Sequence, residues 1–198
     1  ATFSFHPVKH IATGEGGMIT TNNDELAKKI RLLRTHGITK DPQEMSKLDG
    51  GWDMEMQLLG YNYRMPDLLC ALGISQLKRI ETNLLRRREI ASKYDSGLSH
   101  LPLKTPRVHE GVRHAYHLYV IQTDRRKNLY EYLKQNKIYC QVHYIPIYTQ
   151  PYYRSRYGVQ AFSKMDQYYS QALSLPMYHS MTDQDQETVI TTIANFFK

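Results

Sequence analysis

The chain has 198 residues, enough for one sizeable domain or two small ones. Its 41% hydrophobic and 23% charged residues fit a soluble globular protein, and the absence of any long apolar run excludes a membrane-spanning helix. A net charge of +7 favours anionic partners, but the basic clusters at 86–88 and 125–127 are short and lack interleaved aromatic residues, which favours solvated helix faces or ends over a nucleic-acid interface.

The cysteines and the first residue place further bounds on the protein. Cys70 and Cys140 lie far apart and match no metal-binding spacing, so we expect free thiols, no metal site and a reducing cytoplasm. The chain starts at Ala1, inside a strand-like run and without an initiator methionine. We therefore expect the C-terminal part of a longer protein.

The first stretch that suggests chemistry is a single lysine between two short strand-like runs. The apolar run Phe3–Val8 leads to Lys9, and a glycine-rich turn at 14–17 leads to the second run, Met18–Thr21. A rigid support suits a Schiff-base lysine, whose amine must reach one carbon of a bound aldehyde cofactor. Taken alone, a solvated surface lysine is the commoner explanation.

The next elements are two helices separated by a polar segment. The first helix is predicted to begin after Asn23 as N-cap and to stop at Gly37. Residues 38–60 are polar and weakly periodic, which predicts a long loop. A long helix is then predicted from Pro66, with an apolar stripe that continues towards Gly97.

The remainder of the chain predicts a small α/β unit followed by helices. The predicted elements are a strand at 117–121, a helix at 125–135 capped by Thr123, a strand at 138–142, a helix at 162–173 and a last helix from Thr182. Thr182 and Asp185 have the spacing of a capping box.

Two further segments contain side chains that could bind a ligand. In the segment 60–65, Asn62 and Arg64 offer donors suited to an anion, although a surface arginine at a loop–helix junction is the more common explanation. His143 follows a predicted strand and precedes a proline-bearing loop, where binding residues are common. A structural histidine explains that pattern equally well.

Three segments together resemble the DegT/StrS-type sugar aminotransferases, which are pyridoxal-phosphate enzymes. They are SFHPVK followed by GEGGMITT, then GYNYRM, then VHYIPIY. The resemblance implies pyridoxal 5'-phosphate as cofactor and these roles: Lys9 as the catalytic Schiff-base residue, Asn62 and Arg64 as ligands of the cofactor phosphate across a homodimer interface, and His143, Tyr144 and Tyr148 as substrate-binding residues. It covers nearly the whole chain but only about half of a family member.

The same resemblance implies a fold and a domain organisation. The fold class is α/β, the C-terminal portion of a fold-type I aminotransferase. Residues 1–65 would end the large cofactor-binding domain and hold the lysine and the interface loop. Residues 66–101 would form a long connecting helix, and residues 102–198 a small C-terminal α/β domain.

The activity implied is transamination at C4 of a UDP-linked 4-keto-6-deoxy sugar, with glutamate as amino donor, in bacterial surface-glycan biosynthesis. Tyr148, where many members have histidine, together with Tyr152 and Tyr153, resembles the branch that acts in pseudaminic acid biosynthesis. The N-terminal half of such enzymes supplies most cofactor ligands. We therefore expect the 198-residue chain alone to be inactive.

Two alternatives remain open at this point. A sugar dehydratase on the same scaffold has histidine in place of the lysine, so Lys9 argues against it. The other alternative is a folded region that dimerises without performing chemistry.

Overall fold

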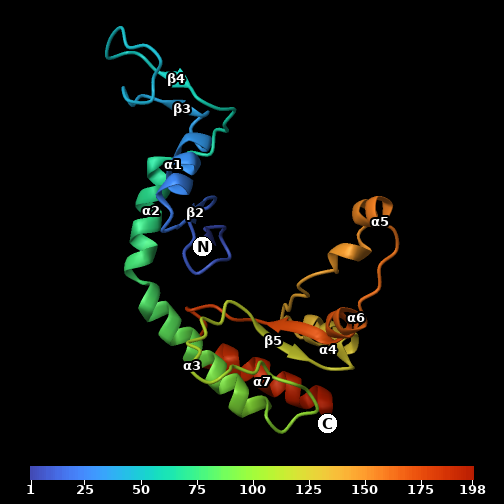
Figure 1. Cartoon of the computed structure of the whole chain (residues 1–198). Coiled ribbons are helices and arrows are strands. Elements are labelled where there is room, and N and C mark those ends of the chain that lie inside the picture. Colours follow the sequence, from blue (N-terminus) through green and yellow to red (C-terminus); the bar gives the residue numbers. More distant parts are fainter. The chain divides into compact units, whose positions relative to one another are not determined.

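A computed structural model describes residues 1–198, which form two compact units, Ala1–Ile80 and Glu81–Lys198 (Figure 1). The elements of the first unit are β1 (Thr2–Ser4), β2 (Gly17–Ile19), α1 (Asp24–Leu33), β3 (Ile38–Thr39), β4 (Glu55–Met56) and α2 (Asp67–Lys78). Those of the second are α3 (Ile80–Leu98, which begins at the boundary), β5 (Tyr119–Gln122), α4 (Arg126–Gln135), the 3-10 turn η1 (Ile147–Thr149), α5 (Pro151–Tyr157), α6 (Ser163–Gln171), β6 (Ala172–Leu175) and α7 (Asp183–Phe197).

Helix α1 begins where its N-cap signal predicts, but it ends at Leu33, before the predicted stop at Gly37. The Asn23 side chain accepts a hydrogen bond from the Leu26 backbone N–H at 2.9 Å, which confirms the N-cap. Gly37 follows the helix with φ of +71°, and a Cβ there would lie 1.8 Å from the Leu58 carbonyl oxygen. Only glycine fits this position, because it tolerates both the positive φ and the close backbone.

The sequence predicts a long loop at residues 38–60. The structure shows instead that this segment contains the antiparallel pair β3 and β4. The connection between these strands is held mainly by Glu55, whose carboxylate accepts the Ser46 and Lys47 backbone N–H groups. The pairing was missed because each strand has only two residues, too few for an alternating pattern to be recognised.

The single long helix predicted from Pro66 is two helices. The helical geometry is interrupted at Arg79, with φ of −104° and ψ of 0°, between α2 and α3. Helix α2 has no buried residue, whereas α3 buries Ile90, Tyr94 and Leu98 in the core of the second unit. The domain boundaries at 65 and 101 stay a prediction.

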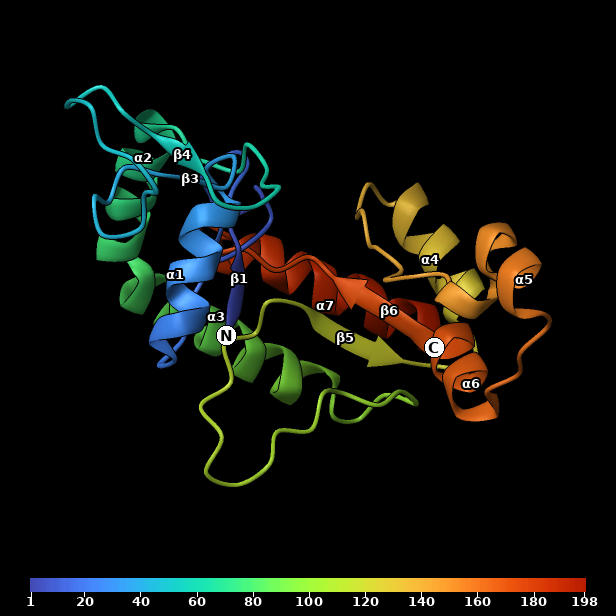
Figure 2. The ribbon, with the colours of Figure 1, turned by 45° about the horizontal axis from the view of Figure 1, so that its top comes forward.

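The core of the second unit lies between the β5–β6 pair and three helices. The two strands lie side by side (Figure 2). They are antiparallel, with Tyr119 opposite Leu175. Apolar side chains from α3, α4 and α7 pack with the strands in one cluster that includes Tyr94, Leu129 and Ile193, all fully buried. This cluster fixes the two strands, and through them the segment after residue 140 that contains His143.

Several boundaries in the second unit differ from the prediction. The strand predicted at 138–142 is reduced to one bridge, between Gln141 and Ser174. The helix predicted at 162–173 ends at Gln171, and the following residues form β6. Thr123 does not cap α4, because its hydroxyl accepts the Arg125 N–H and the cap position is Arg125 itself. The capping box of Thr182 and Asp185 is confirmed.

Cys70 and Cys140 are free thiols, as predicted, and burial raises the pKa of the Cys140 thiol to about 12. No helix combines the length and the apolar character that crossing a bilayer requires.

The prediction that the 86–88 cluster is a solvated helix face is wrong for its central residue. Arg87 is only 8% exposed, and burial lowers the pKa of its guanidinium. Its Nη1 donates to the carbonyl oxygens of Tyr116, His117 and Met177 at 3.0, 3.4 and 3.3 Å. Arg87 therefore ties the chain before β5 to the chain after β6 through charge-assisted hydrogen bonds.

Replacing Arg87 with methionine should destabilise the second unit, because the methionine keeps the aliphatic stem but leaves these partly buried carbonyls without their donor. We expect a loss of about 1.5–3 kcal/mol in urea-induced unfolding. Arg88→Met is the matched control, because Arg88 makes one exposed hydrogen bond, to the His114 carbonyl oxygen. Its effect should stay within about 0.5 kcal/mol. Equal losses for the two variants would contradict this role of Arg87.

Candidate functional site

Lys9 lies in a loop, residues 5–16, that connects β1 to β2 and is here called the lysine loop. Its ends are joined by the Phe5 N–H, which donates to the Gly16 carbonyl oxygen at 2.9 Å. The Thr13 N–H donates to the Phe5 carbonyl oxygen, also at 2.9 Å, and Thr13 is fully buried. The Lys9 N–H closes a turn onto the His6 carbonyl oxygen. Lys9 therefore lies in a loop that backbone hydrogen bonds close at its ends.

The lysine loop packs against α2 and the residue before it. A Cβ on Gly16 would lie 3.0 Å from the Met65 sulfur, and a Cβ on Gly73 would lie 3.1 Å from the Thr13 methyl carbon. Both glycines allow a close approach that a side chain would hinder. The Lys9 side chain is half-buried and makes no hydrogen bond or ion pair, so its amine is available to a ligand.

Asn62 and Arg64 belong to an extended segment fixed to the end of α1. The Tyr61 and Tyr63 N–H groups donate to the Leu33 and Arg34 carbonyl oxygens at 2.6 and 2.9 Å. The Tyr61 and Tyr63 rings stack at 4.9 Å, so they share one side of the segment. Alternation along an extended chain places Asn62 and Arg64 together on the other side.

The side chains of Asn62 and Arg64 are exposed and have no partner within the chain. Two exposed donors, one of them a guanidinium, are suited to a phosphate or carboxylate. The segment that carries them leads directly into Met65, which touches the lysine loop. The structure therefore brings the segment of Asn62 and Arg64 up to the loop of Lys9 within the first unit.

His143, Tyr144 and Tyr148 are gathered near the β6 strand and α6 of the second unit. The His143 Nδ1 lies 2.9 Å from the Ser174 hydroxyl oxygen, and the Tyr144 ring meets the His143 ring edge-on at 4.7 Å. Tyr144 is 75% exposed. These contacts fix the histidine ring and leave the tyrosine ring open to a ligand.

Tyr148 is held by two residues around α6. Its hydroxyl donates to the Asp166 carboxylate, and its ring meets Phe162 edge-on at 4.9 Å. The hydrogen bond to Asp166 is the main cause that raises the pKa of Tyr148 to about 12. Tyr148 is therefore neutral at physiological pH, and its hydroxyl hydrogen is already used, so its oxygen can only accept from a ligand.

Ser174 and Asp166 are site residues that the sequence analysis missed. Ser174 lies in β6, just after the helix predicted at 162–173 and in no predicted element, so nothing predicts it near His143. Asp166 lies in the first turn of α6, where an acidic residue has an ordinary explanation. No local signal could have found either residue.

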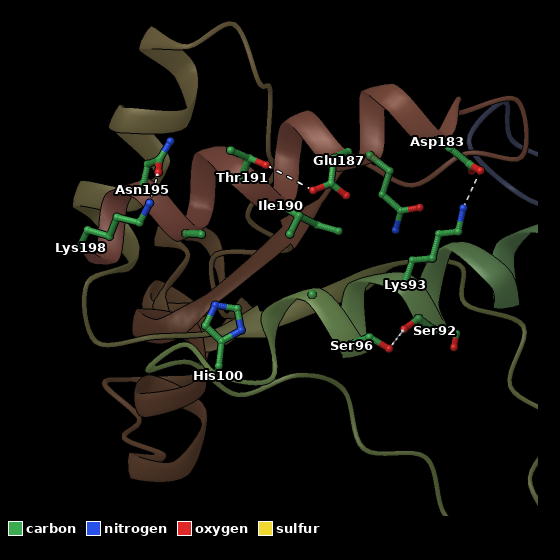
Figure 3. A pocket seen from close by; sticks show the side chains of 13 residues that line it. Ser92, Lys93, Ser96, His100, Asp183, Glu187, Ile190, Thr191, Asn195 and Lys198 are labelled. Carbon is green, nitrogen blue, oxygen red and sulfur yellow. Dashed lines mark hydrogen bonds and ion pairs between the residues drawn. The ribbon is translucent and has the colours of Figure 1, made fainter.

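One groove of the second unit is separate from these residues. It has a volume of about 920 Å³ and lies between α3 and α7 (Figure 3). The charged side chains that Figure 3 shows there have partners, such as Lys93 with Asp183 at 2.6 Å. None of the predicted site residues lines this groove.

The comparisons with known proteins agree on one family. The sequence model of the DegT/DnrJ/EryC1/StrS aminotransferase family matches residues 1–194. The spore coat polysaccharide biosynthesis protein SpsC of Bacillus subtilis is 42% identical, over 99% of this chain and 53% of that protein. A UDP-4-amino-4,6-dideoxy-N-acetyl-beta-L-altrosamine transaminase of Campylobacter jejuni is 40% identical, over 96% of this chain and 50% of that protein.

A solved structure shows the same fold. Helicobacter pylori PseC, an aminotransferase involved in the biosynthesis of pseudoaminic acid, matches with a TM-score of 0.87 and 29% identity, over 99% of this chain and 52% of that chain. The predicted fold class is confirmed, because the chain has part of the α/β fold of these sugar aminotransferases. The chain spans about half the length of the relatives that it matches.

Proposed function

Since the chain belongs to the DegT/DnrJ/EryC1/StrS aminotransferase family, we propose that it is part of a pyridoxal-phosphate-dependent enzyme that aminates a nucleotide-linked keto sugar. Members of this family use pyridoxal 5'-phosphate. The observation that carries the proposal is the closed lysine loop, which holds the Lys9 amine without a partner in the chain. A surface lysine that only interacts with solvent does not require a closed loop to position its amine.

The donor set of the first unit fits this cofactor. The Lys9 amine suits the aldehyde carbon, and the Asn62 and Arg64 side chains suit the phosphate. When bound, pyridoxal phosphate supplies an electron sink for the substrate carbon. Lys9 would hold the cofactor, and its Nζ would afterwards move the proton to and from the substrate carbon as general base and acid.

The second unit would bind the sugar nucleotide. Tyr144 offers an exposed ring face for stacking, and Tyr148 offers an acceptor oxygen for a hydroxyl or amide N–H of the substrate. The name of the Campylobacter relative describes an amine at C4 of a 4,6-dideoxy sugar. By analogy we propose a UDP-linked 4-keto-6-deoxy sugar as substrate and glutamate as donor, in surface-glycan biosynthesis in the cytoplasm.

The assembly proposed is a homodimer. Every residue of α2 is at least partly exposed in the chain, including apolar Leu68, Ile74 and Leu77, which are 80%, 61% and 56% exposed. Apolar side chains exposed to this degree along one helix favour a protein partner. Asn62 and Arg64, which precede α2, would then reach the cofactor phosphate of the second copy.

A product assay with a full-length enzyme carrying this sequence tests the proposed activity. Incubation with the UDP-linked 4-keto-6-deoxy sugar and glutamate should yield an aminated sugar nucleotide and 2-oxoglutarate in equal amounts, measured by mass spectrometry. The loss of water from the sugar without amination would instead support the dehydratase. No reaction with a range of keto sugars and amino donors would support the non-catalytic alternative.

A further inference from the structure

Ser174 is held by backbone pairing on both of its sides. It lies in β6, opposite Val120 of β5, and is only 5% exposed. On its other side its N–H donates to the Gln141 carbonyl oxygen at 2.8 Å, and its carbonyl oxygen accepts the Gln141 N–H at 3.1 Å. Its hydroxyl therefore has a fixed position relative to the chain that carries His143, two residues after Gln141.

The direction of the hydrogen bond between Ser174 and His143 follows from the partners available. The Ser174 hydroxyl makes one side-chain hydrogen bond, 2.9 Å to the His143 Nδ1. A buried hydroxyl hydrogen without an acceptor is unfavourable, and Nδ1 is the one acceptor within reach. The hydroxyl therefore donates to Nδ1, and the neutral imidazole must carry its own hydrogen on Nε2.

We propose that Ser174 is a positioning residue that fixes the orientation and the tautomer of His143, so that Nε2–H is offered as a hydrogen-bond donor. Nε2 makes no hydrogen bond within the chain, and the edge-on contact with Tyr144 limits rotation of the ring. The partner of Nε2–H is an acceptor oxygen of the bound nucleotide, either a uracil carbonyl or a diphosphate oxygen. The identity of this ligand rests on the proposed function, whereas the tautomer does not.

The tautomer can be measured without any cofactor. We would label the 198-residue chain with 15N histidine, assign His143 with a His143→Gln variant, and record two-bond 1H–15N correlations at a pH where the rings are neutral. The wild type should show a protonated Nε2 and an unprotonated Nδ1. Ser174→Ala should lose this preference and give a mixture of tautomers, and Ser174→Thr, which keeps the hydroxyl, should restore it.

The control is Ser170→Ala, because the Ser170 hydroxyl bonds to the Gln167 carbonyl oxygen on the exposed α6 helix. It should leave the His143 signals unchanged. A wild-type ring protonated on Nδ1 would overturn the proposal, and so would a Ser174→Ala spectrum identical to that of the wild type. The wild-type measurement decides even if Ser174→Ala fails to fold.

The ligand is tested separately in the full-length enzyme. Ser174→Ala should raise the KM for the sugar nucleotide about 2- to 10-fold and leave the KM for the amino donor and kcat unchanged, because one hydrogen bond is lost. The double variant with His143→Gln should be no worse than His143→Gln alone. A shift of the His143 signals by uridine would identify the base as the partner, and a shift by UDP alone would identify the diphosphate.

These results separate the two proposals. If the tautomer is as stated but His143→Gln leaves the KM for the sugar nucleotide unchanged, the proposed sugar site is wrong and the role of Ser174 in orienting the ring stands. If the tautomer is different, the inference about Ser174 fails whatever the enzyme binds.

Discussion

Replacing Lys9 with alanine in a full-length enzyme carrying this sequence is expected to lower kcat by about 10²- to 10⁴-fold, the usual contribution of a general acid or base. The loss of the covalent attachment should reduce the rate further. The reason lies in the lysine loop. Its closed backbone positions one amine, so no neighbouring lysine can take its place without a change in the loop.

Chemical trapping identifies the lysine directly. Reduction of the cofactor-loaded enzyme with borohydride, followed by peptide mapping, should place the pyridoxyl group on Lys9. Lys29→Ala serves as control, because Lys29 is exposed on α1 and makes no ion pair, and it should retain full activity. Label on any other lysine, or normal turnover by Lys9→Ala, would show that Lys9 does not hold the cofactor.

The isolated 198-residue chain should show no transaminase activity, unlike the full-length enzyme. The chain spans about half the length of the relatives it matches, and the resemblance assigns most ring and phosphate ligands to the N-terminal half of such enzymes, which leaves the Lys9 amine with few neighbours that could hold the cofactor. Exposed Asn62 and Arg64 cannot compensate alone.

The elements that the sequence predicted well are those whose signals are local. Asn23 caps α1 through its own side chain, and Thr182 and Asp185 form their capping box across three residues. In both cases the residues that decide the structure are neighbours in the chain.

The elements that were mispredicted depend on partners far along the chain. The sequence predicts a helix over the first half of β6 and no strand there, and only the pairing with β5, 50 to 56 residues away, makes it a strand. Arg87 was assigned to a solvated face, although the three carbonyl oxygens that bind it come from segments 29 to 90 residues away. No local pattern contains such contacts.

The candidate site shows the same division. The motifs predict Lys9, Asn62 and Arg64 as site residues, and in the structure Met65, next to Arg64, lies against the lysine loop. The residues that orient the site were not found. Ser174 and Asp166 act on His143 and Tyr148 from 31 and 18 positions away, and only the folded chain brings them together.

A mixture of two inactive variants should regain activity if Asn62 and Arg64 act across a subunit boundary. Arg64→Ala removes a charge-assisted contact to the cofactor phosphate, worth about 1.5–3 kcal/mol. This corresponds to a loss of roughly 10- to 150-fold in cofactor affinity. At limiting cofactor the variant should be nearly inactive, and Lys9→Ala should be inactive at any cofactor concentration.

In a dimer formed from one subunit of each variant, one of the two sites keeps both groups. That site has Lys9 from the Arg64→Ala subunit and Arg64 from the Lys9→Ala subunit, whereas no site in either parent dimer has both. Because random mixing makes half of the dimers mixed, and half of their sites intact, roughly a quarter of the wild-type activity should return. Mixed dimers are verified with two affinity tags, and the activity is assayed at limiting cofactor.

A failure of the mixed variants to regain activity would also identify an arrangement of the site. Arg64 is followed in the same chain by Met65, which lies against the lysine loop of its own subunit, so a contact within one subunit is a real alternative. In that arrangement every site of a mixed dimer lacks either Lys9 or Arg64. A mixture that stays as inactive as its parents, while mixed dimers demonstrably form, would place Lys9 and Arg64 of one site on the same chain and leave α2 as a contact surface without a catalytic role.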